Sequence, residues 1–508
     1  MMKTRPPVQS IFAFLLIASA ILACNQFTPN PTATPLPTAA KPDSTATAKP
    51  VESIEPTDPR AGSSGLGDSL YPEFGNGGYD VEHYTLDITV NNVSTSDLTA
   101  ITTIATKATQ VLSSFNLDFI GFEISSIAVN EEPARFERGG QELTVTPSTL
   151  LAENESFTVT IQYSGSPENF VSQALPFQTG WVTFDGGSFV LSEPDGAASF
   201  YPVNDHPLDK ASYTFRVTVP EPFEVAANGV LTETIDNGDT NTFLFEARDP
   251  MASYLVTINI DEFDVETMES ADGTPIRNYY AADLPEEVRK PFARQGEMLT
   301  YFGRLFGPYP FEVYGSLVLN TEFGAALENQ TLSIYSIDMI DVNDLAGTES
   351  VVAHEMAHQW FGDSVSVADW SEIWLNEGFA TYAQGLWIEH TDGRAALDEW
   401  VKSQYEDLAI YREYVTPPGN PPADDLFNSG VYVWGGLALH ALRLEVGDEV
   451  FFETLRTYHE RYKGGNAMTD GFISIAEEVS GKELREFLDN WLYGEKIPPI
   501  PELGLRAE

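Results

Sequence analysis

Residues 351–382 read VVAHEMAHQWFGDSVSVADWSEIWLNEGFATY, and this stretch decides the fold. His354 and His358 are four residues apart, so a helix places both imidazoles on one face, with Glu355 beside them. Two imidazoles placed in this way can bind one metal ion, and the adjacent glutamate can contact a water molecule at that ion. The pattern therefore predicts a zinc site on a helix.

A catalytic zinc ion needs a third protein ligand and one open position. A third histidine at the spacing HExxHxxGxxH is excluded, because Phe361 and Ser364 stand at the glycine and histidine places. Glu377 follows His358 after 18 residues, in a second predicted helix within SEIWLNEGFATY. The segment between them can turn, so Glu377 can face the first helix. We therefore expect one zinc ion per chain, held by His354, His358 and Glu377.

The sequence around this stretch divides into a strand half and a helix half. Before it, the runs HYTLDITVNN (83–92), SYTFRVTVP (212–220) and SYLVTINI (253–260) alternate polar with β-branched or aromatic residues. Such runs predict an all-β domain, a saddle or sandwich, over residues 76–268. Helical patterns predict an α+β domain over residues 269–508, with strands inside GSLVLNTEFGAALENQTLSIY (315–335). The expected fold class is α+β, in more than one domain.

The composition excludes several classes of protein. The chain has 508 residues, with 27 Lys and Arg against 76 Asp and Glu, and a net charge of −49. This charge argues against nucleic acid as a partner, because a phosphate backbone requires a basic face. The apolar share of 42% excludes a wholly disordered chain, and the single cysteine excludes an intramolecular disulfide.

The first residues are predicted to be a targeting segment. Lys3 and Arg5 precede an apolar run, residues 11–23, that is too short to span a membrane and typical of a signal peptide over residues 1–23. The end of this run, ILAC, resembles the lipobox of bacterial lipoproteins and predicts acylation of Cys24; the alternative is an ordinary secretory signal. Residues 24–75, rich in Pro, Thr and Ala, predict a tether. We expect an extracytoplasmic lipoprotein anchored to a bacterial cell membrane.

Three further motifs accompany the zinc motif. The HExxH motif, followed after 18 residues by the glutamate of WLNEGFATY, resembles the aminopeptidase N family of zinc metallopeptidases, which are gluzincins related to leukotriene hydrolase. Residues 325–329, AALEN, resemble the Gly-Ala-Met-Glu-Asn motif of this family. Residues 191–194, LSEP, resemble its Gln-x-Glu-Pro, and residues 432–435, YVWG, its Tyr-x-Lys-Gly. The resemblance covers the chain from about residue 79 and implies a β saddle followed by a thermolysin-like catalytic domain.

The resemblance also implies roles for individual residues. Glu355 is expected to act as the general base, and Tyr432 to donate its phenol to the oxyanion. Glu328 and Glu193 are expected to bind the amino terminus of the substrate, with Ala325 and Ala326 along the substrate backbone. The chain departs from the family at Leu191, Ala325 and Trp434, which replace Gln, Gly and Lys. These departures affect substrate preference rather than the zinc chemistry.

The expected function is a monomeric zinc aminopeptidase that removes residues from peptides with a free amino terminus. Family members usually continue into a helical C-terminal domain that roofs the cleft, and we expect this roof to be absent or reduced. A zinc endopeptidase with an open cleft is therefore the first alternative. An inactive, peptidase-like surface binding protein is the second alternative. It predicts that a zinc ligand or the general base is lost, but the sequence retains all of them.

Overall fold

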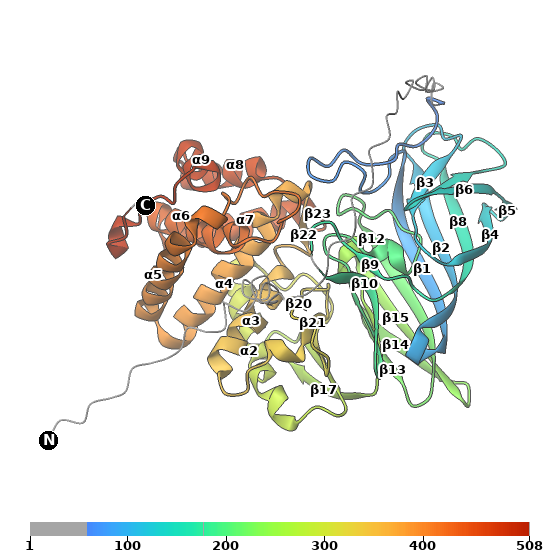
Figure 1. The fold of residues 1–508 in the computed structure, drawn as a ribbon. Helices are drawn as coiled ribbons and strands as arrows, with labels where there is room; N and C mark the ends of the chain where they lie inside the picture. The colour runs from blue at the N-terminus through green and yellow to red at the C-terminus, as the bar shows by residue number, and fades with distance from the viewer. Residues whose placement is uncertain (1–57, 176, 507–508) are drawn as a thin grey trace, which may run out of the picture.

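The computed structural model describes residues 58–175 and 177–506, which form a β domain and an α+β domain side by side (Figure 1). The β domain lies at the right of the figure and the helices at the left. The predicted fold class is confirmed. The predicted signal peptide and Cys24 lie outside the described residues. Among the residues that are described, no helix has the length and apolar character needed to cross a membrane.

The β domain is built around an eight-stranded sheet. Its strands β1 and β12 pair in parallel, and the other neighbours in this sheet are antiparallel where their register is given. Side chains along β12 alternate between buried and partly exposed, as the sequence pattern predicts for a sheet with one face in the core. In spatial order the strands are β14 (Val230–Asp236), β15 (Thr240–Met251), β12 (Ala211–Pro220), β1 (Tyr79–Asn92), β2 (Asp97–Ala108), β8 (Ser156–Gly165), β4 (Glu123–Val129) and β5 (Glu132–Pro133).

Two smaller sheets complete the β domain. One has five strands, in the order β13 (Glu224–Ala227), β16 (Ile258–Asp261), β11 (Gly187–Leu191), β10 (Gln178–Phe184) and β9 (Phe170–Val171). The other has the order β3 (Phe115–Asp118), β7 (Glu142–Thr146) and β6 (Arg135–Gly139). The run predicted as a strand over residues 253–260 is only partly one. It begins with a 3-10 turn, η4 (Ser253–Leu255), and continues as β16.

The α+β domain has a five-stranded sheet covered by helices. The sheet order is β17 (Phe263–Glu269), β18 (Pro275–Ala281), β19 (Tyr314–Leu319), β21 (Ser333–Ser336) and β20 (Ala326–Leu327). The α-helices are α2 (Gln295–Phe306), α3 (Leu345–His358), α4 (Trp374–Asp392), α5 (Arg394–Ile410), α6 (Gly435–Val446), α7 (Asp448–Tyr462), α8 (Thr469–Ser480) and α9 (Arg485–Tyr493). Short strands β22 (Val365–Val367) and β23 (Gly465–Ala467) pair in parallel. The strands predicted within residues 315–335 are present.

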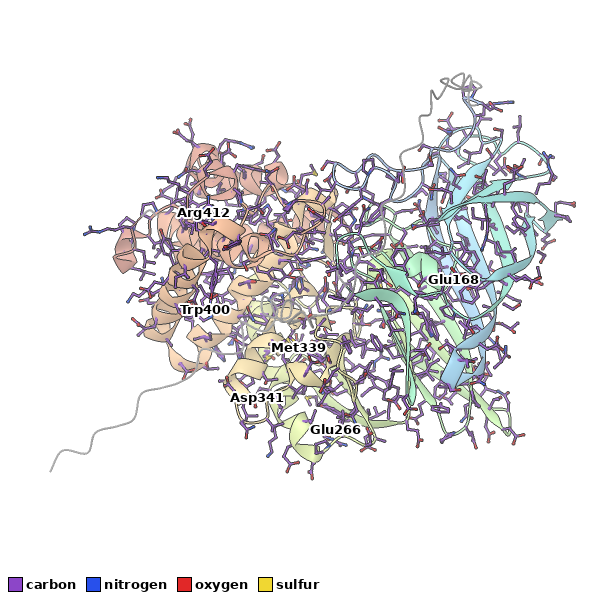
Figure 2. The ribbon with its side chains drawn as sticks, in the orientation of Figure 1. Glu168, Glu266, Met339, Asp341, Trp400 and Arg412 are labelled. Atoms are coloured by element: carbon purple, nitrogen blue, oxygen red, sulfur yellow. The ribbon has the colours of Figure 1, made fainter. Side chains whose placement is uncertain are left out.

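Glycines let the helices around α4 approach closely. A Cβ atom on Gly378 of α4 would lie 3.0 Å from the backbone of Gly435, at the start of α6. On another turn of α4, Gly385 lies under the ring of Trp400, which Figure 2 labels on α5. This packing fixes α4 against the π-helical turn η9 (Gly430–Trp434), which precedes α6.

Residues 58–78 pack against both domains. The Oδ2 atom of Asp68 accepts a 2.7 Å hydrogen bond from the backbone N–H of Trp370, and the hydroxyl of Ser69 donates to Asp369 at 2.6 Å. Tyr71, 1% exposed, donates its phenol to a backbone carbonyl of the α+β domain. The predicted tether of residues 24–75 is therefore too long at its C-terminal end, because these side chains find partners that only the folded chain provides.

The domain boundary also differs from the prediction. The sequence pattern places residues 263–268 in the β domain, but they belong to β17, which pairs with β18 in the sheet of the α+β domain. The boundary therefore falls between β16 and β17. Strand alternation is the same in both domains, so the sequence pattern could not separate them.

Buried carboxyl groups in the β domain make its stability depend on pH. Burial raises the pKa of Asp195 to about 7; a hydrogen bond to Ser172 opposes the rise and Asp205 adds to it. The folded chain therefore holds this proton more tightly than the unfolded chain, and the resulting stabilisation is lost as the pH rises from about 4 toward 7. Relative to Asp195→Asn, we expect the unfolding free energy of the wild type to fall by on the order of 4 kcal/mol over this range. Urea unfolding of both proteins at several pH values measures this change. A difference in unfolding free energy between the two proteins that stays constant with pH would contradict the prediction.

Candidate metal centre and substrate site

The three predicted zinc ligands lie together and are buried. Nε2 of His354 is 3.3 Å from Oε2 of Glu377, and Nε2 of His358 is 3.5 Å from the same oxygen. Two ligands of one tetrahedral zinc ion, each about 2.0–2.1 Å from it, are about 3.3 Å apart. Among the residues that the structure describes, these three form the one group of histidine or carboxylate side chains with metal-binding spacing. The donors and their separations fit zinc.

The turn after α3 fixes the orientation of His358. Nδ1 of His358 lies 3.1 Å from the carbonyl oxygen of Phe361, and because a carbonyl can only accept, Nδ1 carries the proton. The lone pair of Nε2 is therefore left for the metal. Gly362 follows with a φ of +138°, and a Cβ atom there would lie 3.2 Å from Nδ1. Any other residue would strain the turn that holds the ligand.

Three further carboxylates surround the zinc ligands. Glu193, Glu328 and Glu355 are 8%, 2% and 6% exposed. Glu193 comes from the β domain, directly after β11; Glu328 follows β20, and Glu355 lies on α3. Burial of negative charge without positive partners is costly, so this group of acids requires cations. A zinc dication and a substrate ammonium are cations of the kind it requires.

The acids titrate differently because their neighbours differ. Burial opposes the charge of Glu377, but the imidazoles of His358 and His354 outweigh it and lower its pKa to about 2. Burial raises the pKa of Glu193 well above its usual value, and Glu328 and Glu377 add to the rise. Burial raises the pKa of Glu355 in the same way, with His358 opposing. Glu377 is therefore ionised, while burial favours the protonated form of Glu355.

Tyr432 lies beside the metal ligands. Its ring stacks on that of His354, with centroids 6.0 Å apart and an angle of 20° between the planes. Burial raises the pKa of Tyr432 well above its usual value, and Glu377 and Glu193 add to the rise, so its phenol keeps its proton and can donate it in a hydrogen bond. The turn η9, which carries it, is a π-helix. Such turns are frequent at functional sites.

Ala325 and Ala326 lie at the edge of the sheet. Ala326 pairs with Tyr335 of β21 on one side, and β20 ends the sheet order on the other. Both alanines are partly exposed. An edge strand leaves backbone groups free to pair with an extended peptide, and the contact of these alanines with a substrate backbone stays a prediction.

Two contacts from the β domain reach the site and were not predicted from the sequence. Nζ of Lys210 donates to the carbonyl oxygens of Asp363 and Ser364, in the turn after α3, at 2.7 and 3.2 Å. The phenol of Tyr254 lies 3.4 Å from Glu328. Neither residue belongs to a motif, and a strand pattern gives no indication of a contact with another domain.

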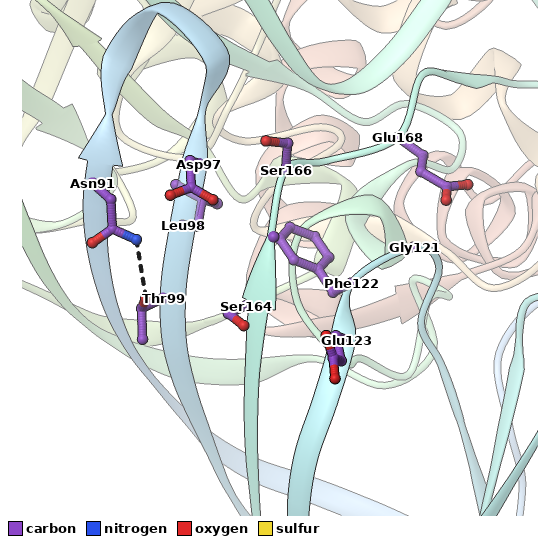
Figure 3. A pocket seen from close by; sticks show the side chains of 11 residues that line it. Asn91, Asp97, Leu98, Thr99, Gly121, Phe122, Glu123, Ser164, Ser166 and Glu168 are labelled. Atoms are coloured by element: carbon purple, nitrogen blue, oxygen red, sulfur yellow. Dashed lines mark hydrogen bonds between the residues drawn. The ribbon is translucent and has the colours of Figure 1, made fainter.

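A separate hollow lies on the β domain, between the ends of β2, β4 and β8 (Figure 3). It has a volume of about 660 Å³ and is lined by mostly exposed residues, among them Asp97, Glu123 and Glu168. None of the predicted site residues lines it. The candidate functional site is therefore the one at the zinc ligands.

The HExxH helix, the distal glutamate and the β domain define a zinc metallopeptidase. The family model of the peptidase M1 N-terminal domain matches residues 80–255, and the model of the peptidase family M1 domain matches residues 292–491. An M1 zinc metallopeptidase from Deinococcus radiodurans, solved as a glutamate-to-alanine mutant with a Tyr-Ser-Ala substrate, is 33% identical, with a TM-score of 0.80. That alignment covers 86% of this chain and 100% of the other. The chain belongs to peptidase family M1.

Other relatives agree with this placement. A two-domain M1 zinc metallopeptidase bound to L-arginine is also 33% identical, with a TM-score of 0.79 over 86% of this chain and 99% of its own. The glutamyl aminopeptidase of Sus scrofa is 28% identical over 318 residues, which are 59% of this chain and 34% of that protein. The chain spans about a third of the length of the curated relatives it matches.

Proposed function

We propose that this protein is a zinc aminopeptidase that releases residues from the free amino terminus of peptides. The observation that carries the proposal is the pair of buried carboxylates, Glu193 and Glu328, beside the zinc ligands. An ammonium group placed between them gains favourable charge contacts, which a blocked amine lacks. The relative solved with a Tyr-Ser-Ala substrate supports a peptide as the substrate class.

The zinc ligands, Glu355 and Tyr432 have different roles in the proposed hydrolysis. His354, His358 and Glu377 would hold the zinc ion, which would supply Lewis-acid polarisation of the scissile carbonyl and a lowered pKa for water. Glu355 takes the proton from the attacking water and passes it to the leaving amine. Tyr432 donates its phenol to the oxygen on which negative charge develops.

Removing the charge of Glu328 is expected to weaken the recognition of the amino terminus. In Glu328→Gln the shape is kept and one ammonium contact is weakened, so we expect KM for free-amine substrates to rise between about ten- and a hundredfold. Glu193→Gln is expected to act in the same direction. Steady-state kinetics on aminoacyl arylamides measures the change. An unchanged KM in both variants would remove these residues from their proposed role.

The proposed activity is tested with paired substrates. Aminoacyl arylamides and their α-amine-blocked copies are incubated with a truncated protein that begins at residue 58, with and without chelator. We expect chelator-sensitive release from the free-amine members alone. Equal release from blocked substrates would favour the alternative of an endopeptidase with an open cleft. A protein that binds zinc yet cleaves neither form would favour the binding-protein alternative.

We further propose that the enzyme acts as a monomeric lipoprotein outside the bacterial cytoplasm, anchored through Cys24. The lipobox-like ILAC and the Pro- and Thr-rich residues that follow it support this proposal. Labelling of growing cells with a palmitate analogue should mark the wild type and not Cys24→Ser. Equal labelling of the two proteins, or no labelling of either, would contradict it.

A further inference from the structure

We propose that Tyr254, delivered by the β domain, is a positioning residue that holds Glu328 in place to receive the amino terminus. This role rests on the proposed function and adds to it. The β domain contributes Glu193 and also orients Glu328 of the α+β domain. Tyr254 is fully buried, at 0% exposed.

The phenol of Tyr254 connects three parts of the site. Its oxygen is 3.4 Å from Oε1 of Glu328 and 3.4 Å from the carbonyl oxygen of Gly362, in the turn that orients His358. It also accepts a 3.5 Å hydrogen bond from Nδ2 of Asn376, the neighbour of Glu377. With one proton and two acceptors, the phenol can donate to either Glu328 or Gly362. Glu328, the turn after α3 and helix α4 thus share one hydroxyl group.

Glu328 depends on this contact. No other side chain in the described part of the protein donates a hydrogen bond to its carboxylate. Glu328 is 2% exposed, so without this donor its Oε1 would be a buried acceptor with no side-chain partner. Rotamers of Glu328 that reach another donor or solvent would then be favoured. Tyr254 supplies the donor that holds the carboxylate in its present position.

The turn that carries Tyr254 is itself held rigidly. The hydroxyl of Ser253 donates to Oδ1 of Asp205 at 2.7 Å, and Oδ2 of Asp205 accepts from the backbone N–H groups of Gly196 and Ala198 at 3.4 Å. Gly196 and Ala198 follow Glu193 closely in the chain. Asp205 therefore connects the segment that carries Glu193 to the turn that carries Tyr254.

Two contacts fasten this turn to the α+β domain. Nδ2 of Asn329, next to Glu328, donates to the carbonyl oxygen of Leu255 at 3.1 Å. The ring of Tyr254 packs edge-on against Trp370, with centroids 5.4 Å apart. The phenol is therefore fixed relative to Glu328 from both sides.

A double-mutant cycle tests the role. Tyr254→Phe removes only the hydroxyl, and we expect it to raise KM for free-amine arylamides about tenfold, with a much smaller change in kcat. In a Glu328→Gln background the same substitution should change KM less than about twofold, because it acts through that carboxylate. Tyr213→Phe, which removes another buried hydroxyl of the β domain that contacts Tyr201, is the matched control and should leave KM unchanged.

A binding measurement separates this role from a general loss of structure. Calorimetry of the zinc-loaded proteins with L-tryptophan and N-acetyl-L-tryptophan should show weaker binding to Tyr254→Phe for the free amine alone. An equal rise in KM in both backgrounds, or equal weakening of binding for both ligands, would overturn the proposal. Wild-type protein that cleaves free and blocked substrates equally would instead overturn the proposed function, and the positioning role with it.

Discussion

Glu355→Gln is expected to lower kcat by about 10²–10⁴-fold while the protein keeps its zinc. The substitution preserves the shape of the side chain and removes the group that accepts a proton. Glu355 is not among the three residues with metal-binding spacing, so its charge is not needed to hold the ion. Its raised pKa, caused first by burial, suits a group that must keep the proton until the amine leaves.

Two measurements decide this prediction. Metal analysis should give one zinc per chain for both wild type and variant, and stopped or steady-state assays should show the loss in kcat. Glu349→Gln, a substitution on the same helix at a residue that pairs with Arg294, should keep wild-type activity. A Glu355→Gln variant with more than about a tenth of the wild-type kcat would contradict the role of general base.

Glu377→Gln is expected to lose zinc, and activity with it. Glu377 provides the only negative charge among the three ligands, and its pKa of about 2 keeps that charge through the working range. Zinc at a thousand times its Kd would raise the unfolding free energy of the wild type by about 4 kcal/mol, and the variant should lose most of this stabilisation.

The zinc dependence of unfolding measures this effect directly. Urea unfolding with and without added zinc should differ strongly for the wild type and little for Glu377→Gln. Asp392→Asn, at the exposed end of the same helix, should respond to zinc as the wild type does. A Glu377→Gln variant that keeps stoichiometric zinc would require another third ligand.

The sequence predicted the parts of the site that depend on local spacing. His354 and His358 share a face because a helix has a fixed period, and Glu377 lies in a second helix that has room to turn back. The strand alternation gave the fold class in the same way. These features depend on residues near one another in the chain, so one sequence is sufficient to find them.

The features that escaped prediction depend on contacts between distant segments. Tyr254 lies in a run that alternates like a strand, yet it forms a 3-10 turn because Asp205 and Asn329 bind that turn from two domains. Asp68, in a Gly- and Ser-rich stretch, was assigned to the tether because its partner Trp370 is about 300 residues away. The π-helical turn at Tyr432 lies beside the close approach of Gly378 and Gly435, a contact between distant segments that helical periodicity does not reveal.

Aminopeptidase activity is tested most directly by a time course on an unlabelled peptide of about ten residues, followed by mass spectrometry. Zinc-loaded protein, chelated protein and protein reloaded with zinc are compared, each with the peptide and its N-acetylated copy. We expect a series of products shortened one residue at a time from the free amino terminus, lost on chelation, restored by zinc and absent for the acetylated copy. Internal fragments from both peptides, or cleavage that survives complete removal of zinc, would contradict it.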